Sequence, residues 1–130
     1  LSGLNMSGNS FYLVNLKGAI LSGANLDKAT FTNCDLSHAN LSKASLVGSS
    51  LGIAEGNGVD LAHANLSGSN LTGATISTKS LIYTDLTDAN LSGADLRTTD
   101  ATQLKALPTV SKAYYYRNSP PKLPGRLKPA

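Results

Sequence analysis

The run ANLSGSNLTGAT, from Ala64 to Thr75, decides the fold of this chain. Divided into fives it reads Ala-Asn-Leu-Ser-Gly, Ser-Asn-Leu-Thr-Gly, Ala-Thr. The same pattern returns as ANLSGADL over 89–96, and it occurs earlier as GANLDKATF over 23–31. A period of five matches neither the helical repeat of 3.6 residues nor the strand repeat of two. The run therefore predicts a repeat architecture in place of an ordinary helix or strand.

Large apolar residues occupy the centre of each five along the first hundred residues. Counted in fives from Leu1 to Leu96, nineteen of the twenty central residues are large and apolar, and Gly56 is the exception. The residue two before the centre is usually small or aliphatic, most often Ala, and the residue before the centre is usually Asn, Asp, Ser or Thr. Disordered segments have no reason to keep such a register, so the repeats predict a folded chain.

The pattern Ala-(Asn/Asp)-Leu-X-X over residues 1–100 resembles the pentapeptide-repeat family. The resemblance implies an all-β solenoid, a right-handed quadrilateral β-helix in which four fives make one square coil. It also implies that the central residue and the residue two before it point inward. Many members of that family come from cyanobacteria, so a photosynthetic bacterial source is consistent with the resemblance.

The residues themselves support that fold, because Asn, Asp, Ser and Gly supply turn chemistry at every corner. At about twenty residues per coil, the repeat over residues 1–100 predicts about five coils. Neighbouring coils should stack about 4.8 Å apart. Every twentieth centre would then lie in the same interior column, which places Phe11 beside Phe31. The predicted core consists of Leu21, Leu26, Phe31, Leu36, Leu41, Leu46, Leu61, Leu66, Leu71, Ile76, Leu86, Leu91 and Leu96.

Two places break the rule. In the stretch GIAEGNGVD, from Gly52 to Asp60, Gly56 would follow Leu36 in its column and leave a hole. We expect a local bulge there, with Ile53 or Val59 turning inward, and an eroded repeat and a recognition loop are both open interpretations. Lys79 occupies an inward position, so we expect the coil to open there or the charged end to escape past the wall.

The pattern fades after residue 100. Residues 101–116 predict a short helical cap over the open end of the solenoid, and residues 117–130 predict an extended, basic, Pro-rich tail. Residues 101–130 contain six bases and no acid, whereas residues 1–100 contain eight acids and five bases. The tail is therefore a solvated end, a site for an anionic partner, or a partner of the chain's own acidic last coil.

No set of residues with catalytic spacing is present. Counted by twenties, His38 and His63 fall on different sides of the square, so we expect no histidine pair. Cys34 is the single cysteine and points inward. We therefore predict no catalytic, metal-binding or cofactor-binding residue, and no cofactor.

These observations favour a non-catalytic scaffold or protein-interaction module whose partner is another protein. The alternative, carried by the resemblance, is a DNA mimic that binds gyrase. The repeats are only weakly acidic and the rod is short, which argues against that alternative. We expect neither a small-molecule substrate nor a nucleic-acid partner, and end-to-end dimerisation through the first coil is a further alternative.

No apolar run reaches the length of about 18 residues that a membrane span needs. The chain starts at Leu1 without Met, in the middle of a repeat, which we interpret as a trimmed or processed form. The compartment is open between the cytoplasm and, if a signal segment was removed, the periplasm or the thylakoid lumen.

Overall fold

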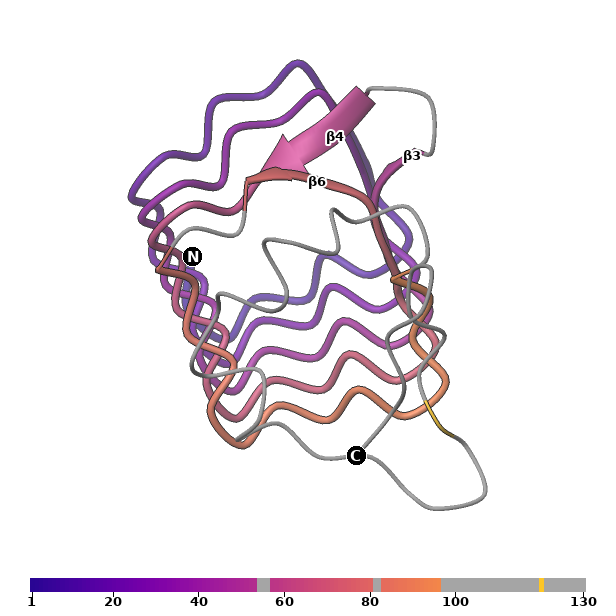
Figure 1. Ribbon diagram of the computed structural model, residues 1–130. Helices are drawn as coiled ribbons and strands as arrows, with labels where there is room; N and C mark the ends of the chain where they lie inside the picture. Colours follow the sequence, from indigo (N-terminus) through magenta and orange to yellow (C-terminus); the bar gives the residue numbers. More distant parts are fainter. Residues whose placement is uncertain (54–56, 81–82, 97–119, 121–130) are drawn as a thin grey trace.

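The computed structural model describes residues 1–53, 57–80, 83–96 and 120, with the backbone alone at 53, 57–58 and 78–80. The chain winds around one axis as stacked, roughly square coils (Figure 1), which confirms the predicted β-helix. The strands of the described part are β1 (Ser10–Tyr12), β2 (Thr30–Thr32), β3 (Ser50–Ile53), β4 (Asn57–Asp60), β5 (Thr75–Ile76) and β6 (Thr78–Ser80).

One wall of the coil is a parallel ladder of short strands. β1 pairs with β2, β2 with β3 and β3 with β5, all in parallel. β4 pairs antiparallel with β3 and parallel with β6. On the remaining sides, single bridges in parallel register join each coil to the next.

Each five makes one corner through the same backbone contacts. At one of them the carbonyl of Leu21 accepts a hydrogen bond from the N–H of Ala24 at 3.1 Å. Gly23, between them, has φ +67°, which an L-residue adopts only at a cost. Asn25 then turns its side chain back, and its Oδ1 accepts from the N–H of Asp27 at 3.0 Å. An Asn or Asp before the centre therefore fixes the corner through its side chain.

The coils do not all have the same length, and here the expected spacing of twenty is wrong. Ile20 pairs with Asn40 across twenty residues, but Asn40 pairs with Asn65 across twenty-five, and Asn65 pairs with Asp85 across twenty again. The third coil therefore contains one extra five. Because the insertion is a whole five, every later centre still points inward.

Because the third coil has twenty-five residues, the interior column of Leu36 has no hole at the next coil. The N–H of Leu36 donates to the carbonyl of Asp60 at 2.9 Å, so Leu61 is the next centre in its column. Val59, one of the two residues expected to turn inward, is fully buried. Gly56 itself lies outside the described residues, and the side chain of Ile53 is not described.

The interior is a continuous column of leucines and small residues. Every residue of the predicted core is buried. Most of the residues two before the centres are alanines, and these are buried as well. Phe11 and Phe31 stack with ring centroids 4.8 Å apart, as expected for one column. Each buried Leu contributes about 1.5–3 kcal/mol. In the first coil Met6, Phe11 and Leu16 are only partly buried, because a coil packs on one of their faces alone.

The predicted helical cap at 101–116 and the basic tail at 117–130 lie outside the described ranges. Lys79 has a described backbone in β6, but its side chain is not described. The part of the chain that the structure describes contains no helix long and apolar enough to cross a membrane.

Candidate functional site

The one cysteine belongs to the packed interior. Cys34 is 2% exposed, and its Sγ lies 3.3 Å from the carbonyl oxygen of Phe11 and 3.5 Å from that of Thr32. A buried thiol of this kind packs as a small apolar group and has no access to a substrate. The candidate sites therefore lie on the outer surface.

The chain leaves the wall through two antiparallel backbone pairs, and we define the hairpin by their described residues, 52–53 and 57–58. Gly52 pairs with Gly58 and Ile53 with Asn57, both antiparallel. Gly52 has φ +96°, so the chain leaves the wall through a conformation that suits glycine. Figure 1 shows β4 running along the next side of the coil after the hairpin, beside β6. The stretch is thus an insertion at a corner, not a repeat that has lost its centre.

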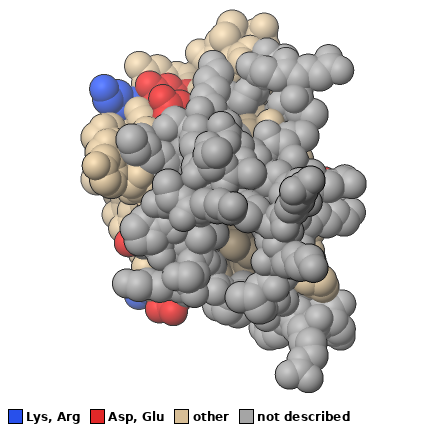
Figure 2. All heavy atoms as spheres, viewed as in Figure 1, with Lys and Arg blue, Asp and Glu red and all other residues tan. Residues whose placement is uncertain are grey.

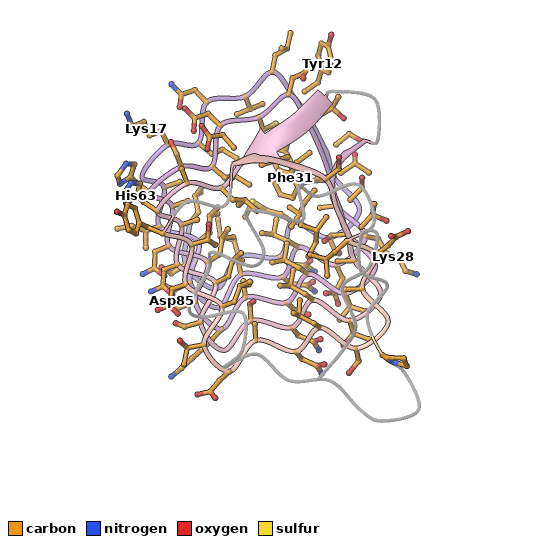
Figure 3. All side chains as sticks on the ribbon, in the orientation of Figure 1. Tyr12, Lys17, Lys28, Phe31, His63 and Asp85 are labelled. Atoms are coloured by element: carbon orange, nitrogen blue, oxygen red, sulfur yellow. The ribbon has the colours of Figure 1, made fainter. Side chains whose placement is uncertain are left out.

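Two exposed apolar residues lie on the same corner of the coil as the hairpin. Tyr12 ends β1 and is 66% exposed, and Leu13 follows it at 63% exposed. Leu13 has φ +57°, which is unfavourable for a residue with a bulky side chain. Figure 3 labels Tyr12 near the start of β4. We call Tyr12, Leu13 and the hairpin the hairpin corner.

Three rings stack on the next corner along the chain, and we call His38, His63 and Tyr83 the ring column. The imidazoles of His38 and His63 have centroids 4.6 Å apart and planes at 4°, and the ring of Tyr83 follows at 5.0 Å and 40°. All three residues are exposed (Figure 3 labels His63), and all have φ between +56° and +60°. Backbone in that region favours glycine, and Gly18 takes the matching position of the first coil.

The expectation that the two histidines lie on different sides is therefore wrong. His38 and His63 are twenty-five residues apart, and the third coil is twenty-five residues long. The hairpin removes five residues from the wall and so brings His63 directly under His38. The only hint in the sequence was the missing apolar centre at Gly56.

Charged groups lie beside the ring column. The backbones of Asp35 and Asp60 form a parallel bridge across the third coil, which places both carboxylates on the same side of the coil. Asp35 Oδ1 accepts from the Ser37 hydroxyl at 2.5 Å and from the Ser37 N–H at 2.9 Å. The hydroxyl, then the N–H, lower the pKa of Asp35 against a smaller opposing effect of burial, and the positive charges of Lys17 and His38 lower it further. Figure 2 shows basic and acidic atoms side by side on the edge where Figure 3 labels Lys17.

Metal-ligating side chains do not gather in larger clusters in the described part of the chain. Within 1–53, 57–80 and 83–96, no group of three or more His, Cys, Asp and Glu is placed to hold a metal ion. Of the two irregularities singled out from the sequence, Gly56 lies outside the described residues, and only the backbone of Lys79 is described. What remains is an exposed apolar corner and, separately, a column of rings with two carboxylates next to it.

Comparisons with known proteins agree with the fold. A family model described as pentapeptide repeats matches in eight copies over residues 10–52, 57–77 and 80–103, and its first gap falls on the hairpin. No curated protein sequence matches the chain significantly.

Two solved structures share the architecture. One is HetL, a pentapeptide repeat protein involved in heterocyst differentiation regulation from the cyanobacterium Nostoc sp. strain PCC 7120. It is 28% identical with a TM-score of 0.66, and the alignment covers 73% of this chain but only 38% of HetL. The other is the pentapeptide repeat protein Rfr23 from the cyanobacterium Cyanothece 51142, at 24% identity and a TM-score of 0.66, covering 94% of this chain and 89% of Rfr23. The second likeness shows the fold alone.

Proposed function

Because this chain belongs to the pentapeptide-repeat family, we propose that it is a non-catalytic scaffold that binds another protein through the hairpin corner. The observation that carries the proposal is the pair of exposed apolar side chains, Tyr12 and Leu13, which adjoin one another on the corner of the insertion. Nothing in the packing of the coil requires an apolar residue at either position.

The surroundings of this pair favour a protein partner. Aromatic side chains are enriched in protein interfaces, where they supply large contact areas at low cost in conformational entropy. β1 is anchored to β2 by three register pairs, so Tyr12 is presented by a rigid ladder. A rigid surface loses little conformational freedom on binding, which favours affinity.

Leu13 adds a second argument. An exposed leucine at positive φ stabilises neither the core nor the backbone, and glycine would be less strained in its place. Seven other described non-glycine residues share a positive φ, so the conformation belongs to the repeat, and it is the exposed apolar side chain of Leu13 that favours a contact outside the chain. Asn33, two after the centre of the next coil, has the same φ sign but is a residue type that tolerates it.

The similarity to HetL favours a binding role over a catalytic one. That protein is described as involved in the regulation of heterocyst differentiation, which names a regulatory process and no reaction. The alignment covers 38% of HetL, so its role does not transfer as a whole. We carry over to this chain only the idea that a β-helix of pentapeptide repeats can serve a regulatory process.

The test is a quantitative capture experiment on extracts of the source organism. Wild-type protein is compared with a Tyr12→Ser/Leu13→Gly variant, which removes both apolar groups and relieves the positive φ, so that folding should be retained. Lys28→Ala is the matched control, because Lys28 is also exposed at positive φ and lies on the neighbouring corner, where Figure 3 labels it below Tyr12. The proposal expects a partner that wild type and Lys28→Ala retain and the double variant loses. Equal recovery by all three proteins would show that the hairpin corner is not the interface.

A further inference from the structure

The ring column places two imidazoles on adjacent coils with the same orientation. His38 and His63 have parallel rings with centroids 4.6 Å apart, and both side chains are exposed. Their corners are held by the wall, since the N–H of His38 donates to the carbonyl of Ala62 at 2.9 Å. The two backbones are therefore fixed relative to each other, while the rings can turn about their side-chain bonds.

We propose that His38 and His63 form a two-histidine site for a borderline divalent cation of the Cu²⁺ or Zn²⁺ kind. Imidazole is a preferred ligand for these ions, and Cu²⁺ binds nitrogen sites most tightly among the first-row divalent metals. This site lies apart from the hairpin corner and does not depend on the proposed scaffold function.

Chelation requires both rings to turn out of the stack, because the imidazole lone pairs lie in the ring planes and the two planes are parallel to within 4°. A metal–nitrogen bond is about 2.0–2.1 Å, so two imidazole nitrogens on one tetrahedral ion are about 3.3 Å apart. The rings must lean towards each other from their stacked separation of 4.6 Å. Among the described residues no hydrogen bond holds either imidazole in place, so within that part the movement disturbs the ring contacts of His38 with His63 and of His63 with Tyr83.

The neighbouring groups favour a cation at this position. Asp35 and Asp60 lie on the same two coils, one row away, and add negative charge. Carboxylates commonly accept the N–H of metal-bound imidazoles, which orients the ring and raises its basicity. With both histidines exposed, water can complete the coordination shell, as in sites where protein ligands fill only some positions.

The site also has a neighbour that makes it testable in a controlled way. Tyr83 follows His63 in the column, with centroids 5.0 Å apart. A His38→Ala/Tyr83→His variant therefore keeps two histidines in adjacent positions of the column but moves the pair one coil along. The His38→Ala and His63→Ala single variants and the His38→Ala/His63→Ala double variant complete the set.

The experiment titrates Cu²⁺ into the full chain, with calorimetry for affinity and electron paramagnetic resonance to count the bound nitrogens. For wild type we expect one ion held by two imidazole nitrogens. Each single variant should bind at least about tenfold more weakly, because the second ligand acts at a high effective concentration only while both are present. The double variant should bind more weakly still, and its residual binding gives the contribution of all groups other than these two imidazoles. The moved pair should restore both affinity and the two-nitrogen signal.

Two outcomes would overturn the proposal. If each single variant keeps wild-type affinity and loses only stoichiometry, the histidines bind independently. If the moved pair fails to restore binding while its circular dichroism and thermal unfolding match wild type, adjacency in the column is not what creates the site. Repeating the titration with Zn²⁺ must give the same ranking of variants, since both ions use the same nitrogens.

Discussion

The second and third coils of this β-helix both complete one square turn around the axis, but they use different numbers of residues. Twenty residues separate Ile20 from Asn40, but twenty-five separate Asn40 from Asn65, and both pairs bridge in parallel. In the second coil every five forms a side of the square, whereas in the third one five leaves as the hairpin. The centres on either side, Leu36 and Leu61, are equally buried. The comparison teaches that the phase of the five-residue repeat controls packing, and that the number of fives per coil is free to change at a corner.

The strongest way to break this comparison is to delete residues. Removing Ser42 from the wall puts every later centre out of phase, and it removes the contacts that the N–H and carbonyl of Ser42 make to Asn40 and Gly23. We expect a loss of several kcal/mol, because at least one Leu and its ladder bonds leave the core. Thermal unfolding followed by circular dichroism measures it.

Removing residues 53–57 should do the opposite. The deletion joins Gly52 to Gly58, which already face each other, and leaves the regular five Gly52-Gly58-Val59-Asp60-Leu61. We expect a folded protein within about 1 kcal/mol of wild type, since shortening a loop changes its closure entropy only slightly. The stacked histidines should survive as well. An unfolded product would mean that the hairpin supports the third coil.

A second comparison asks whether the insertion loosens the core beside it. Leu36→Ala and Leu61→Ala remove equally buried side chains from one interior column, on either side of the insertion. Each should lower the free energy of unfolding by about 2–5 kcal/mol, and the two values should agree within about 1 kcal/mol. Chemical denaturation measures both. A clearly smaller loss for Leu61→Ala would show that the third coil is less tightly packed.

Buried hydroxyls provide a smaller test with opposite signs. Ser49 and Ser69 are 1% exposed, and their Oγ atoms have no hydrogen-bond partner in the described structure, at positions where other coils carry Ala. Thr84 is equally buried, but its Oγ1 donates to the carbonyl of Leu61 at 2.8 Å. Ser49→Ala and Ser69→Ala should each stabilise the protein by about 1 kcal/mol, and Thr84→Val should destabilise it by a similar amount. Destabilisation by either Ser→Ala change would reveal an unseen partner such as buried water.

The sequence predicted the inward residues and the stack of Phe11 on Phe31, but not which residues are neighbours across the third coil. The centres and their small companions follow from the phase of the repeat, and that phase holds from Leu21 to Leu96. Stacking partners depend on how many fives each coil contains, and no local property of the residues determines that count. Gly56 signalled that something differed, but a bulge inside the wall and an insertion outside it leave the same trace in the sequence. The ring column was missed for this reason.

The smallest predicted effect compares two bridges that span the same long coil, Asp35 with Asp60 and Asn40 with Asn65. Ser37 donates its hydroxyl to Asp35 Oδ1 at 2.5 Å, and Ser67 donates in the same way to Asn65 Oδ1 at 2.6 Å. Only the first acceptor titrates. The pKa of Asp35 is lowered from 3.8, mainly by the Ser37 hydroxyl, so the unfolded chain binds the proton more readily than the folded one.

The stabilisation from Asp35 is therefore complete above pH 3.8 and is lost as the pH falls through the lower, folded-state pKa. Ser37→Ala removes the largest cause, so the pKa of Asp35 should rise towards its ordinary value and this acid-dependent loss should shrink. Ser67→Ala is the matched control and should leave the pH dependence of wild type, because an amide acceptor has no proton to gain. Denaturation midpoints across this acid range, with an NMR titration of the Asp35 carboxyl, measure both effects. Identical pH profiles for the two variants would show that the hydroxyl contributes to the corner only as it does at Asn65, without any charge-dependent part.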